Sequence, residues 1–148
     1  MARRRGYDVL GIDFAPAAVA KAKAFDKESE RGSSFATMDI CRERPDRTFD
    51  ALLDHGTLHL VEPGFVGDYF QNTAAVVKPK GKFLLVYPTV TRKKAFRDAE
   101  AKKERLLREL RPIVEPLFDI ERTRDTVLGD VRDGEPYARG VALWLVRR

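Results

Sequence analysis

The sequence predicts an α/β protein with a mostly parallel sheet that ends in an antiparallel pair of strands. Apolar, strand-like runs alternate with helical patterns over most of the chain, an order typical of parallel sheets covered by helices. The last two strand-like runs have no helix between them, so we expect them to be antiparallel. No repeat or linker divides residues 1–148, a length that fits a single domain.

Each element follows from its apolar spacing and from the residues that bound it. Helices are expected where apolar residues recur at helical spacing and Pro or Gly limits the segment. The expected helices are 16–28, 65–77 and 96–110, the last ended by a break at Pro112. The expected strands are 7–12, 34–37, 49–53, 83–87, 118–126 at a sheet edge, and 141–146 in the interior.

The composition is that of an ordinary globular protein. Apolar residues make up 43% and charged residues 34% of the chain. No apolar run approaches the roughly 20 residues that a membrane-spanning helix needs, so no membrane partner is expected. The lone Cys41 has no partner for an internal disulfide. Without an export signal, the expected compartment is the reducing cytoplasm.

The positive charge is concentrated in one segment. The chain carries a net charge of +5, and residues 91–111 hold nine Lys or Arg against four Asp or Glu. Such a face is able to attract RNA or an anionic substrate. The simpler interpretation is a solvated helix with Glu100–Lys103 and Glu104–Arg108 ion pairs.

Two strand ends carry residues that suit chemistry. Asp13 closes the first strand, where a carboxylate is able to accept hydrogen bonds from ribose hydroxyls; alternatively it caps the next helix or its own loop. Asp54 and His55 close the strand 49–53, and His59 follows. His59 is a candidate general base, or simply part of the packing. Asp54, His55 and His59 lack further ligands, so no metal is expected.

Four strings, in order, resemble the class I S-adenosylmethionine-dependent methyltransferases, which have a three-layer Rossmann-like fold. They are Val9–Val19 as the second strand and following helix, Ala36–Ile40 as the third-strand turn, Phe49–His59 as the fourth strand with its exit loop, and Val77–Leu85 as the turn into the fifth strand. Lys80 stands where that turn has a glycine, and Ala15 where a serine is common. The antiparallel ending also fits this fold.

The resemblance implies S-adenosylmethionine as cofactor and methyl transfer to a small-molecule nucleophile as activity. Asp13 would bind the ribose, and Phe14, Met38, Asp39 and Ile40 would surround the adenine. Asp54 and His55 would border the methyl group and the substrate, with His59 as the candidate catalytic base. The Asp54–His59 pattern is similar to methyltransferases that act on thiols and related small nucleophiles. Methyl transfer mainly needs orientation and exclusion of water.

One departure from the family is large. Its first strand and Gly-x-Gly loop have no counterpart, because the ten glycines contain no Gly-x-Gly pair. We therefore expect an N-terminally truncated domain with weak or absent cofactor binding, hence impaired or inactive. In the family, the missing strand lies between the strands that correspond to 7–12 and 49–53, so its absence leaves an edge of each strand open. Either these two edges pair directly, or a second chain supplies the missing strand, or the chain is a fragment of a longer protein. We favour the last interpretation. The alternatives are a non-catalytic interaction module and an RNA-binding or RNA-modifying protein.

Overall fold

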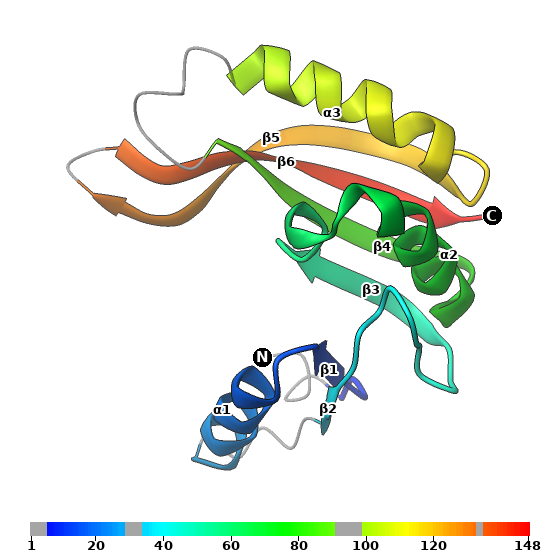
Figure 1. Ribbon diagram of the computed structural model, residues 1–148, viewed down its shortest axis with the longest axis vertical. Coiled ribbons are helices and arrows are strands. Elements are labelled where there is room, and N and C mark those ends of the chain that lie inside the picture. The colour runs from blue at the N-terminus through cyan, green and yellow to red at the C-terminus, as the bar shows by residue number, and fades with distance from the viewer. Residues whose placement is uncertain (1–5, 29–33, 91–98, 133–134) are drawn as a thin grey trace. The chain divides into compact units, whose positions relative to one another are not determined.

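The chain is described by a computed structural model over residues 6–28, 34–90, 99–132 and 135–148 (Figure 1). It divides into two compact units, Met1–Arg44 and Pro45–Arg148, and each is described here by itself. The expectation of a single domain over residues 1–148 stays a prediction. No helix among the described residues is long and apolar enough to cross a membrane.

The first unit is a small parallel βαβ element. β1 (Leu10–Asp13) and β2 (Ser34–Thr37) pair in parallel, with α1 (Pro16–Glu28) between them. Pro16 begins α1 because its fixed φ suits the first helical turn, and the carbonyl of Ala15 accepts the first helical hydrogen bonds. β1 starts later than the predicted residue 7, since its first backbone bond to the region of β2 is made by the carbonyl of Val9.

The second unit is built on a four-stranded sheet with the order β3-β4-β6-β5. β3 (Phe49–His55) and β4 (Val77–Val90) are parallel, whereas β6 (Glu135–Arg147) runs antiparallel to both β4 and β5 (Phe118–Arg132). The predicted antiparallel ending, the edge position of β5 and the interior position of β6 are therefore confirmed.

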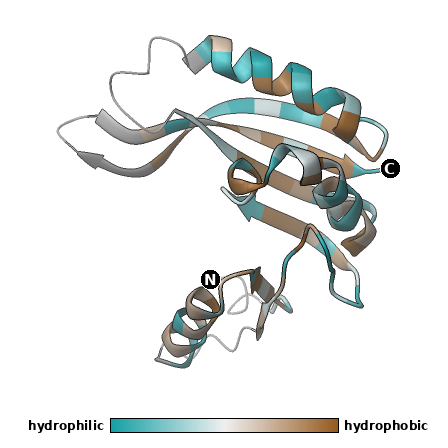
Figure 2. Cartoon of the chain, in the orientation of Figure 1, coloured by the Kyte–Doolittle hydropathy of each residue, from teal (hydrophilic) through white to brown (hydrophobic). Residues whose placement is uncertain are grey.

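Helices and aromatic residues complete the core of this unit. Two short 3-10 helices, η2 (Leu58–Leu60) and η3 (Pro63–Phe65), lead from β3 into α2 (Val66–Val76), and α3 (Ala99–Val114) connects β4 to β5. Tyr69 and Phe70 of α2 are buried and meet edge to face at 5.1 Å. Phe83 and Phe118 are equally buried, and the strands show a corresponding run of apolar residues (Figure 2).

The predicted break at Pro112 is wrong, because α3 continues through it to Val114. Pro112 removes one backbone donor, and it lies on an exposed side of the helix, where water can solvate the unpaired carbonyl of the preceding turn. Val114, one half-turn further, is fully buried and holds the end of the helix against the core. The predicted start of this helix at residue 96 lies outside the described residues.

Each unit is described with its own sheet, two strands in the first unit and four in the second. β1 pairs only with β2, and among the described residues β3 pairs only with β4. Which of the three interpretations of the missing strand holds stays a prediction.

Candidate functional site

The carboxyl ends of β1 and β2 bring Asp13 and the turn that carries Asp39 together. Asp13 is opposite Thr37 in the parallel register, and the amide of Met38 donates a 2.9 Å hydrogen bond to the carbonyl oxygen of Asp13. Met38 and Asp39 then follow directly. Both predicted acidic turns therefore lie at the carboxyl end of β1 and β2, the end at which parallel α/β sheets usually bind ligands, and their role in binding stays a prediction.

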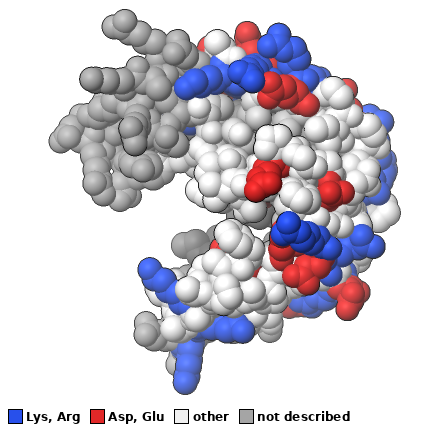
Figure 3. Space-filling view, in the orientation of Figure 1, with Lys and Arg blue, Asp and Glu red and all other residues white. Residues whose placement is uncertain are grey.

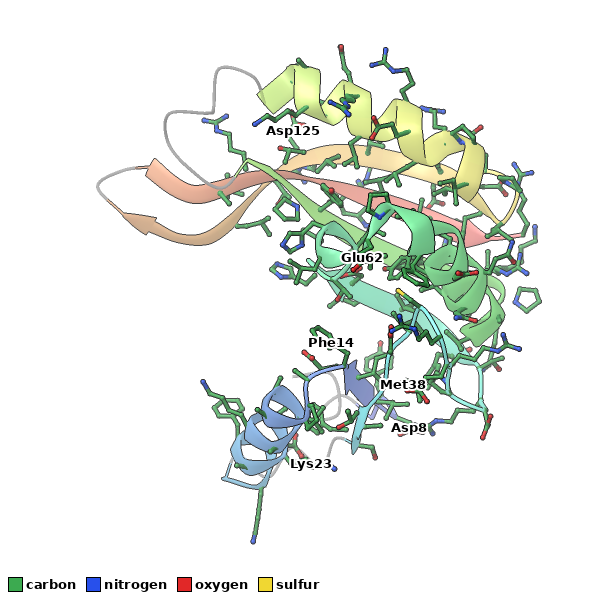
Figure 4. All side chains as sticks on the ribbon, viewed as in Figure 1. Asp8, Phe14, Lys23, Met38, Glu62 and Asp125 are labelled. Carbon is green, nitrogen blue, oxygen red and sulfur yellow. The ribbon has the colours of Figure 1, made fainter. Side chains whose placement is uncertain are left out.

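The carboxylate of Asp13 is exposed and only partly engaged. Its Oδ1 accepts a 2.8 Å hydrogen bond from the amide of Ala15, which fixes the turn between β1 and α1. Its Oδ2 has no partner among the described residues. The side chain of Phe14 is 69% exposed and projects from this turn (Figure 4). One carboxylate oxygen and one aromatic ring are thus available to a ligand.

Asp39 organises its own turn. Its Oδ1 accepts the amide of Cys41 at 3.0 Å, and its Oδ2 forms a 2.7 Å ion pair with Arg42. The amide of Asp39 in turn donates to the Glu43 carboxylate at 3.1 Å. Ile40 is buried and Met38 is half-buried beside it. A carboxylate has about four acceptor positions, so these contacts leave Asp39 able to accept one further hydrogen bond.

Asp54, at the end of β3, is a buried anchor for the loop that follows it. Its side chain is 5% exposed, and it accepts hydrogen bonds from the amides of Thr57 at 2.6 Å and Leu58 at 3.0 Å. The hydroxyl of Tyr69 donates a third bond, at 2.5 Å. Asp54 therefore caps the turn that follows β3, and its place in a cofactor site stays a prediction.

The loop anchored by Asp54 presents two histidines at the carboxyl end of β3. His55 is exposed, and Gly56 follows with a φ of 89° that favours glycine. The ring of His59 lies beside Gly56 and meets Tyr87 of β4 edge to face at 6.2 Å. His59 is exposed and its catalytic role stays a prediction.

Tyr87 is a candidate that the sequence analysis missed. Burial raises the pKa of its phenol, and the negative charge of Glu109 adds to the effect. It stands near the carboxyl end of β4, the strand next to β3 in the parallel part of the sheet. Its place at the carboxyl end of the strand next to Asp54 and His55 is the sequence signal that could have identified it.

The eight predicted site residues fall into two groups. The first unit brings together Asp13, Phe14, Met38, Asp39 and Ile40, and the second unit brings together Asp54, His55 and His59. Within the described residues, no three His, Cys, Asp or Glu side chains lie close enough to hold a metal ion.

Several charged residues of the basic helix α3 form ion pairs. Lys103 contacts Glu100 at 2.7 Å, as predicted, and also Asp125 of β5 at 2.9 Å. Asp125 is labelled in Figure 4. The other pairs are Arg105–Glu109 and Arg111–Glu115, so the predicted pair Glu104–Arg108 is wrong for the described part of α3. Both signs of charge are interspersed on this surface (Figure 3). Residues 91–98 of the predicted basic face lie outside the described residues.

Parallel strands covered by helices, with neighbouring acidic turns at their carboxyl ends, define an α/β protein with a Rossmann-like fold. The family model described as "Methyltransferase domain" matches residues 1–81, more than half of the chain. The chain therefore belongs to this methyltransferase family. A comparison with curated proteins gives no match.

Solved structures of methyltransferases share the fold. One similar structure is a SAM-dependent methyltransferase from Methanosarcina mazei, with 16% identity, a TM-score of 0.73, and coverage of 97% of this chain and 83% of that one. Magnesium protoporphyrin IX methyltransferase from Synechocystis has 20% identity, a TM-score of 0.67, and coverage of 99% and 66%. The N-methyltransferase NodS from Bradyrhizobium japonicum has 16% identity, a TM-score of 0.61, and coverage of 95% and 66%.

Proposed function

We propose that the chain binds the nucleoside half of S-adenosylmethionine at the carboxyl end of β1 and β2. The observation that carries the proposal is the adjacency of the two acidic turns, through the 2.9 Å bond from the Met38 amide to the Asp13 carbonyl. Asp13 would accept hydrogen bonds from the ribose and Asp39 from the adenine amino group, with Phe14, Met38 and Ile40 against the ring.

The donor and acceptor chemistry of this edge fits a nucleoside. Oδ2 of Asp13, which accepts no hydrogen bond from any described residue, suits a hydroxyl donor, and the exposed ring of Phe14 offers an apolar surface for a base. The structures of NodS and of magnesium protoporphyrin IX methyltransferase hold S-adenosylhomocysteine, the demethylated form of the cofactor. When bound, S-adenosylmethionine supplies a methyl group activated by a sulfonium.

The acceptor in this proposal is a small-molecule nucleophile that binds at the carboxyl end of β3 and β4. Asp54 would hold the loop in place through its bonds to Thr57 and Leu58, so that His55 faces the cofactor. His59 would remove a proton from the acceptor, a role suited to an imidazole at neutral pH. The half-buried Tyr87 would form a wall of the acceptor site beside His59.

The proposal includes weak cofactor binding and impaired activity for this chain. The argument for both is that residues 1–148 contain no Gly-x-Gly pair to form the loop that receives the methionine part of the cofactor. A second chain or a further N-terminal segment would complete the sheet beside β3. The single Cys41 supports a reducing cytoplasm as the compartment.

Calorimetry with S-adenosylhomocysteine tests this proposal. We expect the unchanged chain to bind with a dissociation constant above the micromolar range. In Asp13→Asn the dissociation constant should be about tenfold higher still, because this variant keeps the acceptor for the Ala15 amide but loses the charge. Asp46→Asn, in an exposed loop, is the matched control and should bind as the unchanged chain does. Equal affinities of the two variants would contradict the ribose role of Asp13, and micromolar binding by the unchanged chain would contradict the impairment.

A non-catalytic interaction module is the second candidate. The observation that favours it is the outermost position of β3 in the described four-stranded sheet of the second unit, because strand edges readily recruit further strands. Failure to bind S-adenosylhomocysteine at millimolar concentration, together with stable association in solution, would favour this candidate over the first.

A further inference from the structure

The two histidines of the loop after β3 differ in what holds their side chains. His55 is exposed, and its imidazole makes no hydrogen bond or ring contact with any described residue. His59 is also exposed, but its ring meets that of Tyr87 at an interplanar angle of 81°, with the ring centroids 6.2 Å apart. An exposed ring without contacts exchanges between rotamers, whereas a ring packed against another is restricted. One imidazole of this loop is therefore held, and the other is not.

The backbone that carries His59 is fixed on both sides. Leu58, which precedes it, is 4% exposed, and its amide donates a 3.0 Å hydrogen bond to Oδ2 of the buried Asp54. The amide of Leu60, which follows it, donates to the carbonyl of Thr57 at 2.9 Å and closes the 3-10 turn of η2 around His59. With the backbone fixed, the direction of the imidazole depends on the side-chain torsions of His59, which its neighbours restrict.

Gly56 and Tyr87 restrict those torsions from two directions. Gly56 has a φ of 89°, and the imidazole of His59 covers it so closely that Cε1 and Nδ1 would lie 3.4 and 3.6 Å from a Cβ at this position. Tyr87 belongs to β4, which lies between β3 and β6, and it is opposite the fully buried Val141 of β6. The ring that meets His59 is therefore mounted on a strand of the sheet interior rather than on a loop.

Tyr87 itself is not suited to accept a proton. Burial raises the pKa of its phenol, and the negative charge of Glu109 on α3 raises this pKa further. The phenol therefore stays neutral over the pH range of about 5 to 8 in which histidine side chains change charge. A neutral phenol is a much weaker base than an imidazole, so what Tyr87 offers to His59 is the surface of its ring.

We propose that Tyr87 and Gly56 are positioning residues, which hold the imidazole of His59 in one orientation for the proton transfer assigned to it above. The inference rests on the proposed function and deepens it. In that transfer the proton passes to a ring nitrogen of His59, and the electron pair of the broken bond stays on the substrate nucleophile. A general base must stand within hydrogen-bond reach of the proton that it removes, and a misplacement of about 1 Å is able to cost about a hundredfold in rate. His59 combines exposure with a fixed direction, whereas His55 has the exposure alone.

NMR spectra of the histidine rings, recorded without cofactor or substrate, test the role of Tyr87. Protons close to an aromatic ring are displaced in chemical shift by its ring current, so the ring signals of His59 should lie away from those of His55. His59 should also show nuclear Overhauser contacts with Tyr87. Tyr87→Leu should bring the His59 signals to the position of the His55 signals. Tyr87→Phe keeps the aromatic ring and should leave them displaced. His55→Gln and His59→Gln assign the signals.

The same spectra test the role of Gly56. Gly56→Ala should remove most of the displacement of the His59 signals, because an alanine disfavours the φ of 89° and the chain that follows must turn away. Gly56→Asn should keep more of the displacement, since asparagine tolerates a positive φ better than alanine does. Gly64→Ala is the matched control: Gly64 lies in η3 with open space at its Cβ position and no positive φ, and its substitution should leave the His59 signals unchanged.

Two results would overturn the proposal. One is that the signals of His55 and His59 coincide in the unchanged protein and no Overhauser contact joins His59 to Tyr87, a result that needs no variant to fold. The other is a displacement that survives Tyr87→Leu while circular dichroism shows a folded protein. Failure of the proposed function is distinguishable, because calorimetry with S-adenosylhomocysteine measures it separately. A held His59 in a chain that does not bind this ligand would reject the proposed function alone, and a mobile His59 in a chain that binds it would reject the positioning alone.

Discussion

The hydroxyl of Tyr69 donates a 2.5 Å hydrogen bond to Oδ2 of Asp54, joining α2 to the end of β3. Both side chains are buried, with exposed fractions of 2% and 5%. The same carboxylate holds the amides of Thr57 and Leu58, so this bond connects the loop that carries the histidines to the core. A hydrogen bond to a buried carboxylate is stronger than one between neutral groups.

Tyr69→Phe is therefore expected to lower the free energy of unfolding by about 1.5–3 kcal/mol, because one donor to a buried carboxylate is lost. Urea denaturation followed by circular dichroism measures the change. Tyr87→Phe is the control: the hydroxyl of Tyr87 has no hydrogen bond among the described residues, and its loss should change stability by less than about 0.5 kcal/mol. Equal losses in the two variants would contradict an anchoring role for Tyr69.

Gly56→Ala is expected to destabilise the loop between Asp54 and His59. Gly56 has a φ of 89°, a conformation that costs an L-residue about 1–2 kcal/mol. Gly67, in the first turn of α2, has open space around its Cβ position and no positive φ. Gly67→Ala should therefore stabilise the protein by about 0.5–1 kcal/mol. Thermal unfolding of the two variants should show shifts of opposite sign, and shifts of the same sign would contradict this account.

Lys80→Gly is expected to stabilise the protein by up to about 1 kcal/mol. Lys80 has a φ of 64°, which glycine adopts without strain, although the gain is reduced by the greater entropy of glycine in the unfolded chain. Lys80→Val, with a β-branched side chain at positive φ, should be destabilised instead. The midpoints of urea denaturation measure both effects, and a Lys80→Gly midpoint below that of Lys80→Val would rule the strain out.

The local elements of the fold were predictable from local signals. The bounds of α1 and β2 agree with the sequence prediction because Pro16 starts the helix and the helical pattern stops before Gly32. Strand lengths were not predictable in the same way. β5 and β6 continue into the segment 129–136, whose turn residues predict a loop, because each strand supplies the other with backbone partners as far as Arg132 and Glu135. Such pairing is a property of two strands together.

In the candidate site, too, local contacts were predictable from the sequence and contacts made by tertiary packing were not. The strand-end positions of Asp13 and Asp39 follow from the parallel order of strands, so the sequence predicts their adjacency. Asp39 and Arg42 are three residues apart in the sequence, so their ion pair could have been predicted from local spacing alone. The bond between Asp54 and Tyr69 joins residues 15 apart through the packing of α2 on the sheet, and only the structure reveals it.

The ion pair between Asp50 and Lys78 gives a prediction for acid pH. The 2.7 Å hydrogen bond from Lys78, and then its positive charge, hold the pKa of Asp50 below its ordinary value of 3.8. A lowered carboxyl pKa stabilises the fold above the unfolded pKa, and the contribution is lost as the pH falls through the folded pKa. The relevant window therefore lies below a pH of about 4.

Lys78→Met should accordingly raise the pKa of Asp50 toward 3.8, as measured by carboxyl-carbon NMR titration. Lys82→Met removes a lysine that pairs with Glu121 instead, and it should leave the titration of Asp50 where it is. Because both Asp50 and Lys78 are solvent-exposed, the effect on stability should be small, and the unfolding free energies of the unchanged protein and Lys78→Met should converge as the pH falls below this window. A Lys78→Met titration identical to that of the unchanged protein would show that Lys78 does not hold the carboxylate in solution.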